Sequence, residues 1–222
     1  MPLQNRIDPW GKFHANPSRA STRMGNRGIL HDSEKRIIRS WAHKGWVSCL
    51  MSFKDIKRPK PFSDGNYSEL FFLDEATAFS AGHRPCTYCQ RERSHLFREA
   101  WLQANVPDSE QRKTMRLPDI DKVLHTERAV RGGGRVTFDA KLSELPVGAM
   151  FEHEGRAFLL SSKGALPWSF DGYGLKQSIS FETTVRVLTP RSIVRAFSEG
   201  FLPVMHESAG EESSKGLKSS EQ

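Results

Sequence analysis

Two of the three cysteines in this chain stand three positions apart, at the end of the segment Ala81-Gly82-His83-Arg84-Pro85-Cys86-Thr87-Tyr88-Cys89. A Cys-x-x-Cys turn lets both sulfurs face one point, as a tetrahedral Zn²⁺ with Zn–S bonds of about 2.3 Å requires. The third cysteine, Cys49, lies in a segment whose pattern is typical of a strand. We therefore predict a zinc site that includes Cys49, Cys86 and Cys89.

A site with three cysteines needs a fourth ligand from elsewhere in the chain or from solvent. We favour His31, because the glycine-rich run over residues 24–30 bends the chain and can lay this side chain beside Cys49. A carboxylate or water is an alternative. Three other histidines are also candidates: His43, His83 and His95.

Two further interpretations of the Cys86–Cys89 pair stay open. Thiols that precede the N-terminus of a helix have a lowered pKa, so the pair can be redox-active. The thiols can also be inert and buried. A disulfide framework is not expected, because the 222 residues hold only three cysteines and no signal peptide is evident. We expect a reduced, cytoplasmic protein.

The run from Tyr67 to Arg91 resembles the zinc domain of the Ada type, a family that repairs methylated phosphate triesters in DNA. The resemblance, which can be extended back to residue 46, implies a small α/β unit that binds zinc and contacts DNA. His83 stands where this family usually has Phe. The matching residues are Phe71, Phe72, Glu75, Ala76 and the segment 81–89.

The departure from the family pattern concerns the cysteines. The Ada-type site uses four, one of which accepts the methyl group. This sequence has one upstream cysteine, Cys49, where the family has a pair, and Phe53 four residues later cannot bind a metal. The resemblance therefore supports a metal-bearing fold and disfavours methyl transfer.

The charge of the chain favours an anionic partner. The net charge is +7 and the isoelectric point is about 9.5. Where the basic residues cluster, they can neutralise several phosphates of DNA or another nucleic acid. The alternative is a set of solvated loops and helix faces. No apolar run approaches the roughly 18 residues of a membrane span. The candidate nucleic-acid contacts are Arg84, Arg91, Arg93, Lys57, Arg58 and Arg27.

The hydrophobic pattern predicts an α+β chain with a small zinc-bearing, Ada-like unit packed against a second, β-rich domain. We expect a loop-rich segment over residues 1–27, the zinc unit over 28–105 and a linker over 106–116. The β-rich α+β domain follows over 117–206, and residues 207–222 have the composition of a disordered tail.

Within this plan the first unit should contain a short helix over residues 33–41, strands over 46–53 and 67–73, a helix over 75–80 and a longer helix from Gln90. The long helix should bury Leu96, Phe97, Ala100, Trp101 and Ala104. In the second unit we expect a helix from Pro118, a Gly/aromatic loop over 166–174, a final helix after Pro190, and strands over 135–140, 149–153, 156–161 and 178–188.

Catalytic residues are weakly indicated. His125 follows Asp121 by one helical turn, so the carboxylate can orient the imidazole as a general base. A solvated pair is the favoured interpretation. Arg131-Gly132-Gly133-Gly134-Arg135 can clamp a phosphate, but a flexible hinge is favoured. Three functions remain: a zinc-stabilised DNA-binding protein, an enzyme acting on nucleic acid or a phosphorylated substrate, and a zinc-stabilised scaffold.

Overall fold

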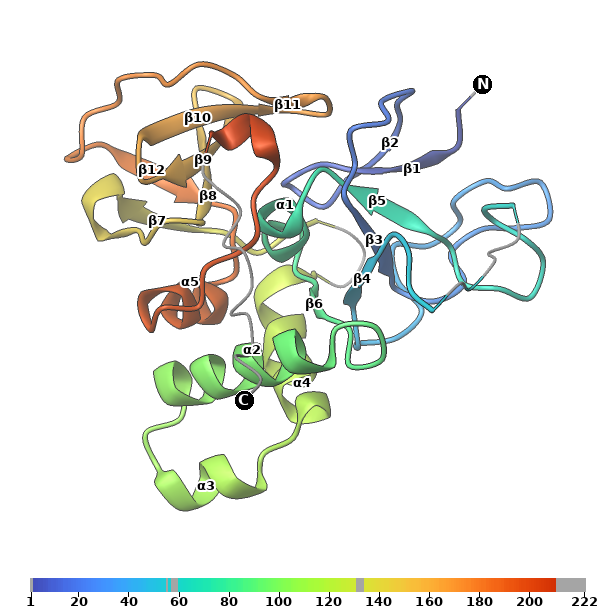
Figure 1. Ribbon diagram of the computed structural model, residues 1–222, viewed down its shortest axis with the longest axis horizontal. Helices are drawn as coiled ribbons and strands as arrows, with labels where there is room; N and C mark the ends of the chain where they lie inside the picture. The colour runs from blue at the N-terminus through green and yellow to red at the C-terminus, as the bar shows by residue number, and fades with distance from the viewer. Residues whose placement is uncertain (1, 55, 57–59, 131–133, 211–222) are drawn as a thin grey trace, which may run out of the picture.

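The structure is a computed structural model that describes residues 2–54, 56, 60–130 and 134–210. The described residues form two six-stranded sheets with helices between and below them, which confirms the predicted α+β class (Figure 1). No helix in this part of the chain has both the length and the apolar character needed to cross a membrane.

The first sheet has the strand order β2-β1-β5-β3-β4-β6. Its central strands bury Met24, Leu70 and Phe72, and β4 pairs antiparallel with β3 so that Cys49 lies opposite Met24. The strands are β1 (Gln4–Ile7), β2 (Phe13–Ala15), β3 (Arg23–Asn26), β4 (Val47–Leu50), β5 (Leu70–Phe72) and β6 (Arg84–Pro85).

The second sheet is antiparallel throughout, in the order β11-β10-β9-β8-β12-β7. A tight turn at Glu154-Gly155, with both residues at positive φ, joins β8 to β9. The strands are β7 (Phe138–Lys141), β8 (Met150–His153), β9 (Arg156–Ser161), β10 (Gly164–Ser169), β11 (Gly172–Tyr173) and β12 (Thr184–Val187).

The α-helices are α1 (Glu75–Ser80), α2 (Arg91–Asn105), α3 (Ser109–Thr114), α4 (Leu117–Arg128) and α5 (Arg191–Ser198). Helix α1 begins at Asp74, whose carboxylate accepts from the backbone N–H of Thr77 at 2.8 Å, and all of its residues are buried. It lies between the two sheets (Figure 1). Ala76 packs with residues of the second sheet and Ala78 with residues of the first.

One hydrophobic core crosses the predicted boundary at residues 106–116. Phe79 of α1 and Trp101 of α2 pack together with Leu124 of α4 and Phe197 of α5. The 106–116 segment itself contains α3 and is more than a linker. The two predicted units therefore share their largest helical core.

Several predicted elements differ from the observed ones. Residues 33–41 form no helix, because Asp32 accepts from the backbone N–H groups of Glu34 and Arg36 and closes a turn with Lys35 at positive φ. Residues 1–27, predicted to be loop-rich, supply three strands. Residues 166–174 form most of the β10–β11 hairpin.

The inward face of the longest helix also differs from the prediction. Leu96 is 47 % exposed, whereas Ser94 and Leu102 are buried beside Phe97 and Trp101. The buried stripe is therefore rotated around α2 relative to the predicted one. At the end of the described chain, Glu207–Ala209 forms a 3₁₀ turn, and residues 211–222, the rest of the predicted tail, lie outside the described part.

Candidate metal centre

The Cys86–Cys89 turn is fixed against strand β4. Strand β6 runs parallel to β4, and the backbone N–H of Cys86 donates to the carbonyl of Ser48 at 2.9 Å. The side-chain amide of Gln90 donates to the same carbonyl at 2.8 Å. Because Ser48 precedes Cys49, these bonds hold the turn beside the third cysteine.

The three sulfurs of Cys49, Cys86 and Cys89 lie within 4.8 Å of one another, and all three cysteines are free. Thiolates on one tetrahedral Zn²⁺ stand about 3.8 Å apart when each Zn–S bond is about 2.3 Å. Cys89 is buried and the other two are half-buried. The group therefore has the donor chemistry and the spacing that a zinc ion requires.

Hydrogen bonds distribute negative charge unevenly over these sulfurs. The Cys49 thiol, together with the backbone N–H groups of Cys89 and Tyr88, donates to Cys86 and lowers the pKa of Cys86 to about 5. The same contact with Cys86, together with burial, raises the pKa of Cys49. Burial raises the pKa of Cys89, whose sulfur accepts from the N–H of Leu50 at 3.4 Å. Without a metal the group thus holds its first negative charge on Cys86.

The three cysteines line a cavity of about 320 Å³. Its wall includes the aromatic rings of Phe53 and Tyr88, whose centroids are 5.4 Å apart. The acidic residue among the described lining residues is Glu69, whose carboxylate accepts from the N–H of Phe62 at 3.0 Å. A metal held by the sulfurs would therefore have space on its cavity side.

The structure does not bring the expected fourth ligand to the sulfurs. The His31 ring stacks on Phe62 with centroids 4.6 Å apart, and its Nδ1 is 2.6 Å from the hydroxyl of Ser68. Among the described residues, no His, Cys, Asp or Glu joins the three cysteines in one ligand group.

The other three histidines are also engaged elsewhere or exposed. His83 is fully buried and its Nε2 accepts from Nε of Arg27 at 3.2 Å. His95 is exposed and lies 3.1 Å from Glu99, one helical turn along α2. His43 is exposed on the loop before β4.

Three of the four described basic residues that were predicted to contact nucleic acid are engaged inside the protein. Arg84 is buried against Asp121, and Arg93 bonds the buried carboxylate of Glu75 at 2.7 Å. Arg27 is 2 % exposed. Arg91, the first residue of α2, is exposed. Lys57 and Arg58 lie outside the described residues.

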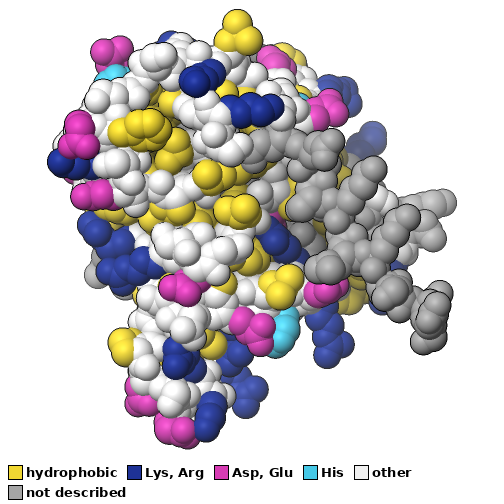
Figure 2. Space-filling view, turned by 60° about the vertical axis from the view of Figure 1, so that its left-hand side comes forward, with side chains coloured by type: hydrophobic (Ala, Val, Ile, Leu, Met, Phe, Trp, Pro, Cys, Tyr) yellow, Lys and Arg dark blue, Asp and Glu magenta, His cyan; other side chains and the backbone are white. Residues whose placement is uncertain are grey.

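Basic side chains are not gathered on the face that carries the second sheet and α5. Figure 2 shows Lys and Arg interspersed there with Asp and Glu, and hydrophobic side chains between them. An extended single-sign surface for a nucleic-acid duplex is therefore absent from the described residues of this face.

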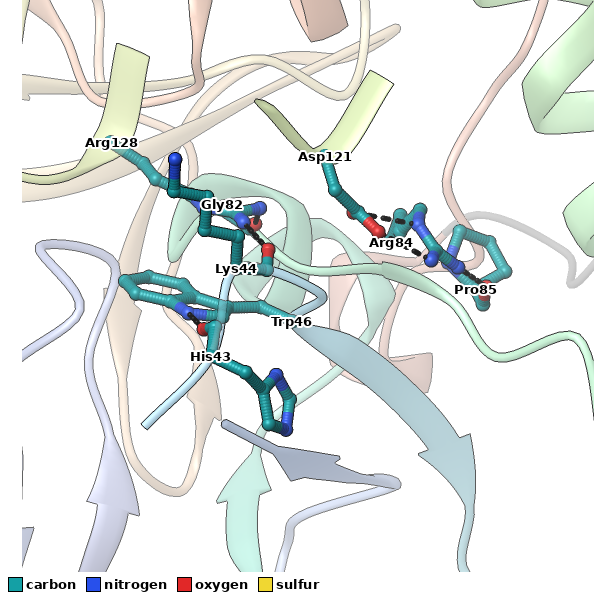
Figure 3. A network of polar contacts seen from close by, with 8 residues as sticks. All are labelled: His43, Lys44, Trp46, Gly82, Arg84, Pro85, Asp121 and Arg128. Atoms are coloured by element: carbon teal, nitrogen blue, oxygen red, sulfur yellow. Dashed lines mark hydrogen bonds and ion pairs between the residues drawn. The ribbon is translucent and has the colours of Figure 1, made fainter. Parts of the chain in front are cut away.

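The proposed Asp121–His125 pair is not formed. Both carboxylate oxygens of Asp121 accept from Arg84, at 2.8 Å and 2.7 Å (Figure 3). The His125 ring packs edge-on against Trp41 and Trp46, and burial with the charges of Arg128 and Lys44 lowers its pKa. Asp121 is thus a structural partner of Arg84 and does not orient His125.

Sequence reasoning missed the role of Arg128. Its guanidinium lies 4.3 Å from the ring centroid of Trp46 and donates to the carbonyls of Gly82 and Lys44 (Figure 3). Arg135, predicted to end a glycine hinge, is half-buried and donates to the carbonyls of Ser80 and Leu188. In the sequence, the position of Arg135 beside the glycine run was the signal; Arg131 and the glycines at 132 and 133 lie outside the described part.

Comparison of the chain with protein-family models, with curated proteins and with solved structures finds no match. The likeness to the Ada-type domain therefore stays a prediction based on the residues quoted above. The class that the structure itself defines is an α+β protein with a three-cysteine group able to hold a metal.

Proposed function

We propose that the protein binds one Zn²⁺ through Cys49, Cys86 and Cys89. The observation that carries this proposal is the approach of three thiol sulfurs to within 4.8 Å of one another from two separate segments of the chain. Thiolates are zinc ligands, and a site of this kind contributes folding energy because the unfolded chain does not hold it together.

The fourth coordination position faces the adjoining cavity in this proposal. Support comes from the space beside the sulfurs and from the engagement of His31 by Ser68 and Phe62. A water molecule or a ligand atom would fill that position. A zinc ion with three protein ligands keeps one site for chemistry or ligand exchange, whereas a four-ligand site is structural.

The partner that we propose for this centre is nucleic acid. The support is the net charge of +7 and the exposed Arg91, two residues after Cys89 at the N-terminus of α2. Arginine at this place can bond a phosphate oxygen, and the helix dipole favours the same anion. The resemblance to the Ada-type zinc domain points to DNA as the nucleic acid.

Cobalt substitution tests the open position. Co²⁺ in place of zinc should give the intense visible bands of a tetrahedral thiolate site, and these bands should shift when cyanide is added as a fourth ligand. The His31→Ala variant should give the same spectrum as the wild type. A spectrum that cyanide does not change, and that His31→Ala alters, would show a closed site with His31 as a ligand.

A further inference from the structure

A second and larger cavity, of about 590 Å³, lies where the two sheets meet the C-terminal end of α4. Aromatic side chains form part of its wall: Trp10, Phe13, Trp41 and Trp46. Basic side chains form another part: Lys12, Arg27, Arg128, Arg135 and Arg186. A volume of this size is in the range of pockets that enclose a small molecule.

Two of these guanidinium groups are withdrawn from solvent and a third is partly so. Arg27 and Arg128 are each 2 % exposed, and Arg135 is half-buried with a buried Nε. In the part of the chain that the structure describes, none of the three forms an ion pair with a carboxylate. Their hydrogen-bond partners are backbone carbonyls and the neutral ring of His83.

Each of these groups keeps a buried N–H without a partner among the described residues. The atoms are Nη2 of Arg27, Nε of Arg128 and Nε of Arg135. Gly11 leaves room in front of two of the groups: a Cβ at this position would stand 3.6 Å from Nη2 of Arg27 and 3.1 Å from Nη1 of Arg135. Donors of Arg27 and Arg135, from two segments of the chain, thus lie beside the same small space.

The neighbouring carboxylates form hydrogen bonds or ion pairs with other groups. Asp8 accepts from Lys12 N at 2.9 Å and contacts the His14 ring at 2.7 Å. Glu152 accepts from the Trp10 indole at 2.7 Å and lies 3.3 Å from Arg186. Asp121 is held by Arg84 as described above. The inner cations therefore lack a compensating anion within hydrogen-bonding distance.

Charge that is only partly compensated at this depth is costly for the folded state. Burial is the main cause that lowers the pKa of Arg128 to about 9; the charges of Arg84 and Arg135 act in the same direction, and those of Asp121 and Glu127 oppose it. Burial and the charges of Arg128 and Arg135 likewise lower the pKa of Arg27. A bound anion would relieve both the desolvation and the mutual repulsion.

We propose that this cavity binds a phosphomonoester carried by an aromatic ring system, as in a nucleoside 5′-monophosphate or the phosphorylated end of a nucleic-acid strand. Arg27, Arg128 and Arg135 face the phosphate. Convergent guanidinium groups suit a dianionic phosphate better than a single carboxylate, because they offer several N–H donors in planar arrays. The site is separate from the three cysteines and does not depend on the metal.

The ring system of the ligand lies against Trp41 in this proposal. The Trp46 ring is already in contact with the guanidiniums of Arg27, at 4.2 Å, and of Arg128, at 4.3 Å. Trp41 is half-buried, lines the cavity and packs against Trp46 with ring centroids 6.2 Å apart. Stacking of a base on an aromatic side chain is worth about 1–3 kcal/mol.

Calorimetric titration of the full chain tests the ligand class. Adenosine 5′-monophosphate should bind at least tenfold more tightly than either inorganic phosphate or adenosine. A short oligonucleotide with a 5′-phosphate, compared with the same strand ending in a 5′-hydroxyl, distinguishes the two sources of the ligand. Tighter binding of the phosphorylated strand than of the mononucleotide assigns the cavity to strand ends, and the reverse assigns it to free nucleotides.

Variants locate the binding in this cavity. Arg27→Gln should weaken binding of the mononucleotide at least tenfold, and Trp41→Ala and Arg186→Gln at least threefold. Arg156→Gln, which changes an exposed arginine outside the cavity, is the matched control and should bind like the wild type. Zinc content should be the same in the wild type and the four variants. A loss of nucleotide binding can therefore be distinguished from a loss of the metal.

The proposal is overturned if the mononucleotide binds no better than phosphate and adenosine, or if the folded cavity variants bind it like the wild type. Circular dichroism shows whether Arg27→Gln is folded. If it is not, Trp41→Ala and Arg186→Gln decide the question, because both positions lie nearer to solvent.

Discussion

At the scale of single residues, burial distinguishes the arginines that stabilise the fold from those that can bind another molecule. Arg84 was predicted to contact nucleic acid, yet it forms a two-bond ion pair with Asp121 in which both side chains are buried. No local pattern indicates this pairing, since the partners are 37 positions apart. The spacing of four residues on a helix suggested His125 as the partner of Asp121, because helical spacing indicates only partners that are close in the sequence.

Removing one member of the Arg84–Asp121 pair should destabilise the protein strongly. Asp121→Asn leaves a buried guanidinium without a counter-charge, so the free energy of unfolding should fall by about 3–5 kcal/mol. Urea denaturation measures this loss. The control is Glu110→Gln, which removes an exposed ion pair with Lys113 and should change the stability by less than about 1 kcal/mol. Equal, small effects of both substitutions would contradict the assignment.

His83 should make stability depend on pH. Burial, and then the charges of Arg27 and Arg128, hold the pKa of His83 well below its usual 6.5. Because Arg27 Nε donates to His83 Nε2, the ring is neutral with its proton on Nδ1. The unfolded chain takes up a proton below about pH 6.5 while the folded chain does not, so this contribution is fully present above that pH and is lost as the pH falls.

The measurement is the free energy of unfolding from pH 5 to pH 8 for the wild type and for His83→Gln. Glutamine still offers an acceptor to Arg27 but does not titrate. The wild type should lose up to about 1.4 kcal/mol more per pH unit than the variant below pH 6.5. Parallel pH profiles for the two proteins would refute the buried neutral state of His83.

At the scale of the elements, the motif and its flanks were predictable because their signals are local. The cap at Asp74, the helix over 75–80 and strand β4 all follow from neighbouring residues. The prediction of a helix over 33–41 was wrong, also for a local reason: the carboxylate of Asp32 accepts from two backbone N–H groups and closes a tight turn. The contact of His31 with Ser68 could not be predicted from local signals, because the two residues lie 37 positions apart.

The start of helix α2 is where nucleic-acid binding can be tested. If Arg91 neutralises one phosphate, Arg91→Ala should lower the slope of log K against log salt concentration by about one, with zinc content unchanged. Fluorescence anisotropy with a labelled DNA duplex measures the slope. Arg156→Ala, an exposed position on β9, is the control and should keep the wild-type slope. Identical slopes in all three proteins would argue against this contact.

At the scale of the whole molecule, two chemically distinct sites flank one strand. Trp46 contacts the guanidiniums of the larger cavity, and Cys49 on β4 belongs to the candidate metal centre three residues later. The α+β class was predictable from hydrophobic periodicity. The shared helical core and the inner arginine cluster were not, because both are assembled from segments far apart in the sequence.

The most direct test of the central claim is the zinc content per chain, by elemental analysis of protein purified without a metal-chelating tag. The wild type should hold about one zinc. Cys49→Ser, Cys86→Ser and Cys89→Ser should each lose it, while His31→Ala should keep it, because the His31 side chain is bonded to Ser68. A wild type without zinc, or loss of zinc in His31→Ala, would contradict a three-thiolate centre with an open fourth position.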